Sequence, residues 1–366
     1  MMRYHTVLAV SWTVLFCAAT LTVANAQSLR LIDHGFYTPF VSTYGDGRPV
    51  VVYRKPNTPF VLWTEECSRA VDDYVVMSTI TIGLSQQSAY ELPVGVVSIV
   101  EEIRMLCVSF LEDGYNSCSD QLVSTFPPRS NQCTSTDLTI APVAISPMGR
   151  RALGRHIVPN PSGDDQVCED IVYMDIFDPS GNSYRPIPIR GIFVDDNGNV
   201  AGYASFYDQR ACLYLWHTDQ VIVLSNNPSE AWYIDEYMRV YGWQYVGNNE
   251  IAIGYWYLQG TTVHWDELGR IPAGDYPVLH GMHVTPDGSK LICWKKQLLP
   301  SASFAVYMWT PETGLVDLNV FYSDLLSSMH VVLNTASGIS WDGRYIVGSA
   351  EQGSTKWVYL LDTACV

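Results

Sequence analysis

Positive charge is scarce in this chain. Its 366 residues include 21 Lys and Arg against 37 Asp and Glu, which gives a formal net charge of −16 at pH 7. Nucleic-acid binding needs clustered Lys and Arg that neutralise phosphates, and anionic membrane surfaces attract the same residues. The composition therefore argues against DNA, RNA and anionic membranes as partners, and we expect a soluble monomer.

Long apolar runs are also lacking beyond the N-terminus. The run from Thr6 to Val23 follows Arg3 and precedes Ala24-Asn25-Ala26, which has the form of a signal peptidase site. We predict a signal peptide over residues 1–26 and a single exported domain over residues 27–366, in the extracellular space or a bacterial periplasm. A membrane anchor is the alternative, which the missing positive charge after the run disfavours. No other stretch is long enough to span a bilayer.

Cysteine is present in an even number once the signal peptide is removed. An even count in an exported protein is typical of disulfides. Cys107 and Cys118 flank the turn-forming residues 111–116 and are the pair that we expect, although buried thiols are the alternative for some of the set. The eight cysteines are Cys67, Cys107, Cys118, Cys133, Cys168, Cys212, Cys293 and Cys365.

The most informative feature that is present is a repeat. Each copy is an apolar run, a tight turn and a second apolar run, and the turn is centred on Asp-Gly, Asn-Gly, Met-Gly or Asn-Asn. Asp-Gly and Asn-Gly tolerate the positive φ of two-residue hairpin turns, so each copy predicts a β-hairpin. The copies are residues 41–55, 143–156, 191–205, 241–257, 281–296 and 338–352.

A second pair of strands follows each hairpin, as in Val306–Leu318, so the unit has four strands. Units recur about every 40 to 55 residues, the spacing of β-propeller blades. A degenerate copy over residues 100–126, with its turn near Glu102, brings the expectation to seven blades; six or eight are the alternatives. The last unit lacks a fourth strand, and we expect residues 29–32 to supply it and close the ring. Ser229–Val240 has helical apolar spacing and lies between units.

These repeats carry a family resemblance over residues 191–362. WTPETGLVDL (309–318) and GISWDGRYIVGSA (338–350) resemble the extracellular repeats called HAF, and TPDGSKLICW (285–294) is similar to the repeats of TolB-type propellers. Both resemblances imply a propeller. Neither brings catalytic residues with it.

Signals for chemistry are few. The sequence has no Gly-x-Ser-x-Gly elbow. His280 and His283 look like a metal pair, but residues three apart on a strand face opposite sides. The Asp195–Asn199 stretch resembles part of a calcium loop, yet Val200 and Phe206 occupy positions where such a loop needs Gly and Glu. We expect no catalytic residue, no metal and no cofactor.

Aromatic residues gather between Ala231 and Tyr257. Flat rings with polar tips suit ligand contact, so we predict a binding face there, with packing between blades as the alternative. The repeated Trp63, Trp216, Trp265 and Trp309 are expected to pack between blades. The candidate binding residues are Trp232, Tyr237, Trp243, Tyr255, Trp256 and Tyr257.

The sequence therefore favours a secreted, non-enzymatic propeller that binds a protein or glycan. One alternative is a secreted carbohydrate-active enzyme, a glycoside hydrolase or lyase, because such enzymes use paired carboxylates and this chain has many. Another is a structural component of an extracellular matrix or surface. Acids with raised pKa values converging at the channel mouth would favour the enzyme, whereas an aromatic patch on one rim would favour the binding protein.

Overall fold

The structure is a computed structural model of the whole chain. The signal peptide, Cys118 and the side chain of Cys107 lie outside what it describes, so the leader and the expected disulfide remain predictions. The residues described are 28–33, 39–43, 49–54, 60–64, 68–70, 79–84, 96–100, 105–109, 120–125, 139–147, 151–159, 165–173, 184–205, 208–274, 279–297 and 303–364.

Antiparallel sheets follow one another along the chain, and six have four strands in chain order. Sheet 1 contains β2 (Phe40–Thr43), β3 (Pro49–Arg54), β4 (Phe60–Thr64) and β5 (Ser68–Ala70). Sheet 2 contains β6 (Thr79–Leu84), β7 (Val96–Val100), β8 (Met105–Ser109) and β9 (Asp120–Thr125). Sheet 3 contains β10 (Thr139–Ile145), β11 (Ala152–Pro159), β12 (Asp165–Tyr173) and β13 (Tyr184–Ile187).

Sheets 4 to 6 repeat this order. Sheet 4 contains β14 (Arg190–Val194), β15 (Val200–Ser205), β16 (Asp208–Leu215) and β17 (Gln220–Val223). Sheet 5 contains β18 (Ser229–Ile234), β19 (Val240–Gly247), β20 (Glu250–Gln259) and β21 (Thr262–Pro272). Sheet 6 contains β22 (Gly281–Val284), β23 (Leu291–Gln297), β24 (Ser303–Thr310) and β25 (Gly314–Asp317).

The last sheet joins the two ends of the described chain. Its strands are β26 (Val331–Leu333), β27 (Gly338–Ile339), β28 (Tyr345–Gln352), β29 (Thr355–Asp362) and β1 (Ser28–Asp33). Both β26 and β27 pair with β28, at opposite ends of that strand. β1 pairs antiparallel with β29, which places Ser28 opposite Asp362. The N-terminal strand thus covers the outer edge of the C-terminal hairpin.

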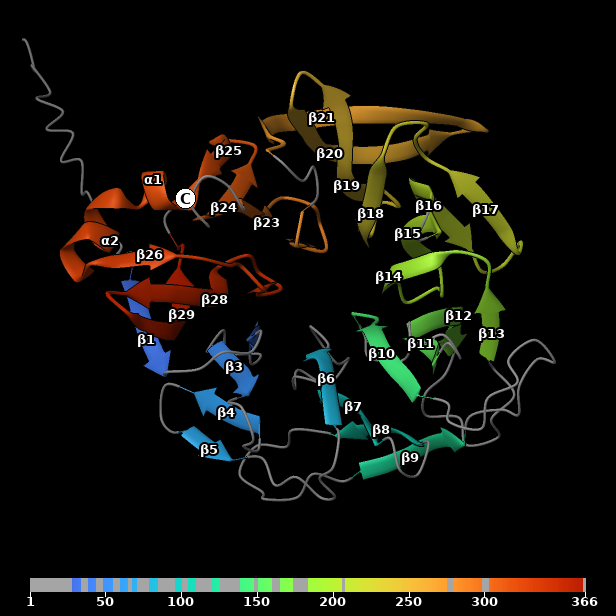
Figure 1. Ribbon diagram of the computed structural model, residues 1–366, viewed down its shortest axis with the longest axis horizontal. Helices are drawn as coiled ribbons and strands as arrows, with labels where there is room; N and C mark the ends of the chain where they lie inside the picture. The colour runs from blue at the N-terminus through green and yellow to red at the C-terminus, as the bar shows by residue number, and fades with distance from the viewer. Residues whose placement is uncertain are drawn as a thin grey trace, which may run out of the picture.

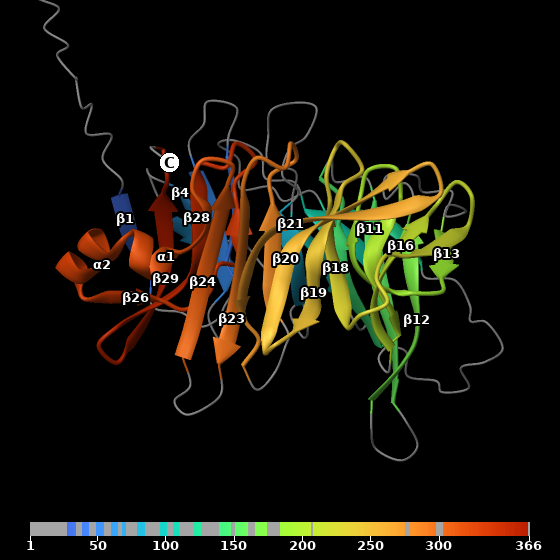
Figure 2. The same ribbon diagram turned by 90° about the horizontal axis from the view of Figure 1, so that it is seen from above.

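The sheets surround a common centre in chain order (Figure 1). The first strand of each sheet contacts the first strand of the next, and β27 of the last sheet contacts β2 of sheet 1. The view turned by 90° shows the strands of successive sheets side by side (Figure 2). This arrangement places the first strands of the sheets around the centre.

Two short helices lie between sheet 6 and the last sheet: α1 (Leu318–Phe321) and α2 (Ser323–Met329). The side chain of Asp317 caps α1 by accepting a hydrogen bond from the backbone N–H of Asn319, at 2.8 Å. Leu318 and Leu326 point into the core of the last sheet. No helix in the described ranges is long and apolar enough to cross a membrane.

Sheet 5 is packed on both faces. One face, with Tyr241 and Trp243, forms a core with residues of sheet 6. The other face, with Val240 and Trp256, forms a core with residues of sheet 4 such as Leu213. Burying a large apolar side chain contributes about 1.5–3 kcal/mol, so each interface adds substantially to stability.

Glycine marks the close approach of first and second strands. A Cβ at Gly202, Gly242 or Gly348 would collide with a backbone carbonyl of the neighbouring strand segment. In sheets 4 and 5 the register of the first strand shifts beside that glycine, as a β-bulge does. This crowding explains glycine inside strands that it would otherwise weaken.

Two units differ from the sequence prediction. In residues 241–257 the Asn248-Asn249 turn joins β19 to β20, the second and third strands, whereas the prediction placed it between the first and second. The first strand is β18, within the segment expected to be helical. β18 is buried almost throughout and carries a bulge, so its apolar residues do not alternate. In residues 100–126 the predicted turn position lies outside the described residues, but it falls between β7 and β8, the second and third strands, because sheet 2 begins with β6.

Cys212 and Cys293 are buried cysteines, and the Cys212 thiol donates a hydrogen bond to the carbonyl of Arg210 at 3.4 Å. Each is fully buried, in β16 and β23 respectively. These two cysteines therefore follow the alternative of buried thiols. Burial also raises the pKa of Cys293 well above its ordinary value, which makes the reactive thiolate rare at neutral pH.

Candidate functional site

In the described parts of sheets 3 to 6 and of the last sheet, the turns that lead into the second strand share one hydrogen-bonding design. At the start of each turn, a short polar side chain accepts a backbone N–H from the end of the same turn, so the turn is held without a long loop. Asp235 accepts from Tyr237 at 2.9 Å and from Arg239 at 2.8 Å. The other starting residues with this contact are Ser146, Asp195, Thr285 and Ser340.

This design accounts for the partial calcium loop seen in the sequence. Asp195 Oδ1 accepts the backbone N–H groups of Asn197 and Asn199, both at 2.8 Å. Its Oδ2 accepts the side-chain amide of Asn199 at 2.8 Å. Both carboxylate oxygens therefore serve the turn, as the absence of a complete loop motif predicts.

Neighbouring turns also contact one another. Arg239 Nη2 donates to the carbonyl of Asp287 at 2.7 Å, and the backbone N–H of Glu236 donates to the carbonyl of Pro286 at 3.0 Å. These bonds join the turn of sheet 5 to that of sheet 6. Further around, Lys290 Nζ donates to Thr363 Oγ1 at 2.8 Å, which joins sheet 6 to the last sheet.

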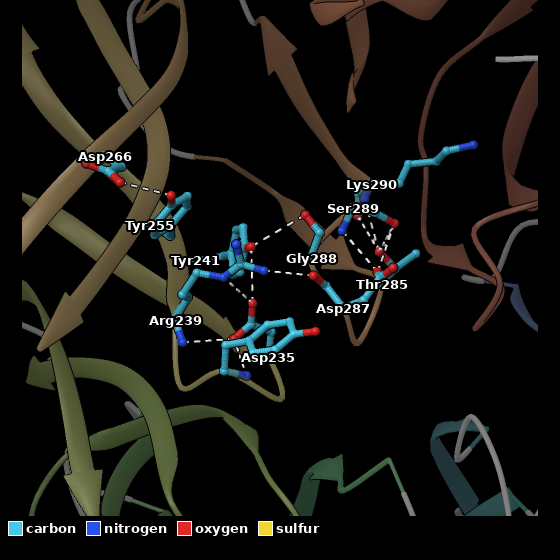
Figure 3. A network of polar contacts seen from close by, with 11 residues as sticks. Asp235, Arg239, Tyr241, Tyr255, Asp266, Thr285, Asp287, Gly288, Ser289 and Lys290 are labelled. Atoms are coloured by element: carbon cyan, nitrogen blue, oxygen red, sulfur yellow. Dashed lines mark hydrogen bonds and ion pairs between the residues drawn. The ribbon is translucent and has the colours of Figure 1, made fainter. Parts of the chain in front are cut away.

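Arg239 is the centre of the polar network in Figure 3. Its Nε donates to Asp235 Oδ2 at 2.6 Å, and the Asp235 side chain has no exposed surface. The guanidinium carbon lies 5.1 Å from the ring centre of Tyr237, 5.7 Å from that of Tyr241 and 5.2 Å from that of Tyr255. These distances fall within the range of cation–π attraction, so one cation orders three tyrosines.

Each of these tyrosines has a carboxylate at its hydroxyl. Tyr241 donates to Asp235 at 3.2 Å and Tyr255 donates to Asp266 at 2.9 Å. Burial, followed by these acids, raises the pKa of both phenols. A hydrogen bond to Glu236 raises the pKa of Tyr237. The phenols therefore stay protonated and act as donors, and they fix the positions of the carboxylates.

The β20–β21 hairpin extends the aromatic surface outward. Trp256 of β20 and Trp309 of β24 occupy equivalent positions, because each pairs with the first residue of the preceding strand. β20 continues for three residues beyond Trp256, whereas β24 ends one residue beyond Trp309. The extension carries Tyr257, whose ring stacks on His264 of β21 with centres 5.2 Å apart. Tyr257 also lies 6.3 Å from Tyr255, so the aromatic row runs from the turn to the hairpin.

We call this row the tyrosine surface and define it as Tyr237, Arg239, Tyr255, Tyr257 and His264. Tyr237 is 65% exposed, and Tyr255, Tyr257 and His264 are partly exposed. Rigid amphipathic rings beside fixed polar groups can hold a ligand by stacking and hydrogen bonding. The surface therefore offers binding chemistry at one rim of the molecule.

Two of the predicted binding residues lie inside the fold. Trp243 is fully buried and Trp256 is 1% exposed, so both pack between sheets in this structure. Trp232 is partly buried, and its indole donates to Glu230 Oε2 at 3.1 Å, as does that of Trp243. The structure thus brings Tyr237, Tyr255 and Tyr257 together at the rim and places the three tryptophans elsewhere in the same sheet.

Three side chains at the candidate site are absent from the sequence prediction: Arg239, Asp266 and His264. A signal for Arg239 exists, because Asp235 and Arg239 have the same spacing as the turn residues Asp195 and Asn199. No such signal exists for Asp266 and His264. They reach the surface through the register of β20 with β21, which pairs Tyr255 with Asp266 and Tyr257 with His264.

Acids with raised pKa values are present, but each of them is engaged in its own structural hydrogen bonds. Burial raises the pKa of Asp195 and of Glu230. Asp195 binds its own turn, and Glu230 binds two indoles. Asp317, whose pKa burial also raises, caps α1. No hydrogen bond or ion pair joins any two of these acids in the described ranges.

His280 and His283 also lie apart from any metal-binding group. His280 is exposed and lies 5.1 Å from the ring of Trp294. Burial of His283 lowers its pKa to about 4. Within the described residues, no group of three or more His, Cys, Asp or Glu side chains is placed to hold a metal ion.

Comparison with known proteins shows the fold. No family model matches the chain, and no curated protein matches it. The oligogalacturonate lyase of Vibrio parahaemolyticus aligns with a TM-score of 0.59 and 11% identity over 91% of each chain. Puromycin hydrolase aligns with a TM-score of 0.51 and 13% identity over 90% of this chain and 52% of its own.

TolB from Acinetobacter baumannii also matches, with a TM-score of 0.43 and 11% identity over 92% of this chain and 79% of its own. That score is too low to support an argument, and the HAF resemblance has no family match behind it. At these identities the two higher-scoring likenesses show the fold alone. The chain is all-β, with four-stranded antiparallel sheets in a propeller-like arrangement.

Proposed function

We propose that the protein is a secreted, non-enzymatic β-propeller that binds a protein or glycan through the tyrosine surface. The observation that carries this proposal is the continuous row of ordered, partly exposed rings from Tyr237 to Tyr257. Arg239 and three carboxylates hold that row in place. Such preorganisation reduces the entropy that binding must overcome.

The propeller of the proposal has seven blades and is closed by the N-terminal strand. The contacts of β2 with β27 and the pairing of β1 with β29 support closure. We also propose that residues 1–26 are a signal peptide and that each HAF-like repeat forms one blade of the propeller. N-terminal sequencing of the exported product tests the first point, with Gln27 as the expected first residue.

A binding screen against glycan and peptide arrays tests the main proposal. Tyr237→Ala and Tyr257→Ala should each weaken any selective binding by at least about fivefold, because stacking area is lost. Phe321→Ala on α1, where the side chain is 41% exposed, is the matched control and should bind normally. Trp243 and Trp256 are unsuited to this test, since truncating buried rings destabilises the fold. Selective binding that all three variants retain would contradict the proposal.

A secreted carbohydrate-active enzyme is the second candidate. The likeness to an oligogalacturonate lyase favours it at the level of fold, although fold does not determine activity. Asp195, Glu230 and Asp317 are each engaged in structural hydrogen bonds of their own segment, which favours the binding protein. Incubation with oligogalacturonate, followed by mass spectrometry, distinguishes the two: an unchanged substrate supports the binding protein, and shortened products support the enzyme.

A further inference from the structure

Three carboxylates beside the tyrosine surface carry negative charge that no ion pair in the described structure neutralises. Glu236, Asp266 and Asp287 are exposed, and none of them forms an ion pair with another described residue. Glu236 and Asp266 are bound to the hydroxyls of Tyr237 and Tyr255. Asp287 lies on the adjoining turn, where its carbonyl accepts a hydrogen bond from Arg239.

The cation of the tyrosine surface, Arg239, is already paired. Arg239 lies 2.6 Å from Asp235, whose side chain is fully buried. Its guanidinium also donates to the Asp287 carbonyl. Arg239 therefore balances the buried acid and leaves the three exposed carboxylates without compensation. An acidic ligand would meet repulsion here.

Exposed rings flanked by carboxylates that lack an ion-pair partner are the chemistry that recognises ammonium and guanidinium groups. The ring face attracts a cation through its quadrupole, and the carboxylate forms charge-assisted hydrogen bonds with it. The chain as a whole has a formal charge of −16, which draws a basic partner in over long range. The row from Tyr237 to Tyr257 also offers several contact points to one extended segment.

We infer that the partner is a protein that presents a basic segment, whose Lys or Arg side chains lie on the tyrosine surface between Glu236, Asp266 and Asp287. This inference rests on the proposed function and narrows it to one class of ligand. Charge complementarity selects the partner, and the ordered rings provide the contact area.

A hexalysine peptide is the probe for the first experiment, with hexagalacturonate and neutral cellohexaose as comparison ligands. Binding is measured by calorimetry at two or more salt concentrations. We expect hexalysine to bind and its affinity to fall with salt. The double variant Glu236→Gln/Asp266→Asn should bind about tenfold more weakly and show a shallower salt dependence. Asp324→Asn, which removes an exposed acid from α2, is the control and should behave as wild type.

Each result decides a different point. Equal weakening in Asp324→Asn and in the double variant would mean general charge attraction and would overturn the inference. Cellohexaose or hexagalacturonate binding that needs Tyr237 but not Glu236 and Asp266 would overturn the inference and leave the proposed function standing. Failure of all three ligands to respond to Tyr237→Ala would overturn both.

Discussion

At the residue scale, Asp235 combines the turn, the cation and the aromatic row in one carboxylate. Asp235→Asn removes the charge that Arg239 faces at 2.6 Å and leaves a half-buried guanidinium unpaired. We expect the free energy of unfolding to fall by about 3 kcal/mol, because breaking one side of a buried pair is costly. Urea unfolding measures this change.

The control is Asp219→Asn. Asp219 also pairs with an arginine, Arg185 at 3.5 Å, but its side chain is 68% exposed. Exposed ion pairs contribute little to stability, so Asp219→Asn should lower the free energy of unfolding by less than about 1 kcal/mol. Similar costs at Asp235 and Asp219 would show that the Asp235–Arg239 pair does not organise the rim.

His283 gives the second prediction at this scale. Burial lowers its pKa from 6.5 to about 4, so the folded state favours the neutral ring. The stability that this contributes is present above pH 6.5 and is lost as the pH falls toward 4. Between pH 7 and pH 4.5, the free energy of unfolding of the wild type should therefore fall by more than about 1 kcal/mol beyond the fall seen for His283→Asn. A difference between the two proteins that stays constant over this range would contradict the assignment.

At the element scale, the bulged inner strand requires a small residue opposite it. Gly242→Ala would drive a Cβ into the carbonyl of Glu230 and to within 2.6 Å of Trp256. We expect the free energy of unfolding to fall by about 2–3 kcal/mol, which is typical of overpacking. Gly260→Ala, at the β20–β21 tip, meets no atom within 4 Å and has φ of +64°. The Gly260→Ala variant should lose only about 1 kcal/mol of stability, from the strain of a positive φ. Thermal unfolding of the two variants compares them, and equal losses would argue against the close approach.

The inner strand of sheet 5, β18, shows how far the sequence could predict the fold. Turns with Asp-Gly or Asn-Gly, such as those at Gly198 and Gly288, identify the hairpins because their chemistry is local. β18 was missed because burial on both faces removes the alternation that marks a strand. The sequence prediction omits β18 and therefore shifts the assignment of sheet 5 by one strand, so that Trp256 counts as an extra aromatic although it is buried in the core.

The candidate site was predictable only in part. Composition indicated the aromatic region, and Tyr237, Tyr255 and Tyr257 do meet at the rim. Which rings face solvent depends on register and on contact with the neighbouring sheets, neither of which is a local property of the sequence. Asp266 joined the surface solely through its pairing with Tyr255.

At the scale of the whole molecule, β1 is the strand that links the two ends. Leu29 is buried against the core of the last sheet, and β1 covers the edge of β29. A chain starting at His34 should lose more than about 3 kcal/mol of stability relative to one starting at Gln27. It should also self-associate, because an uncovered edge strand templates pairing. Urea unfolding and light scattering measure both effects, and a stable monomer from His34 onward would contradict the proposed closure by the N-terminal strand.

The pairing of Ser28 with Asp362 has one more consequence, for the order of the chain. Because the two ends lie in adjacent strands of one sheet, a short linker can join them without disturbing any sheet. New ends can then be opened at an exposed tip such as Gly260-Thr261 in sheet 5. The order of the sheets along the sequence then depends only on the position of the termini. A circularly permuted protein should therefore fold to the same structure.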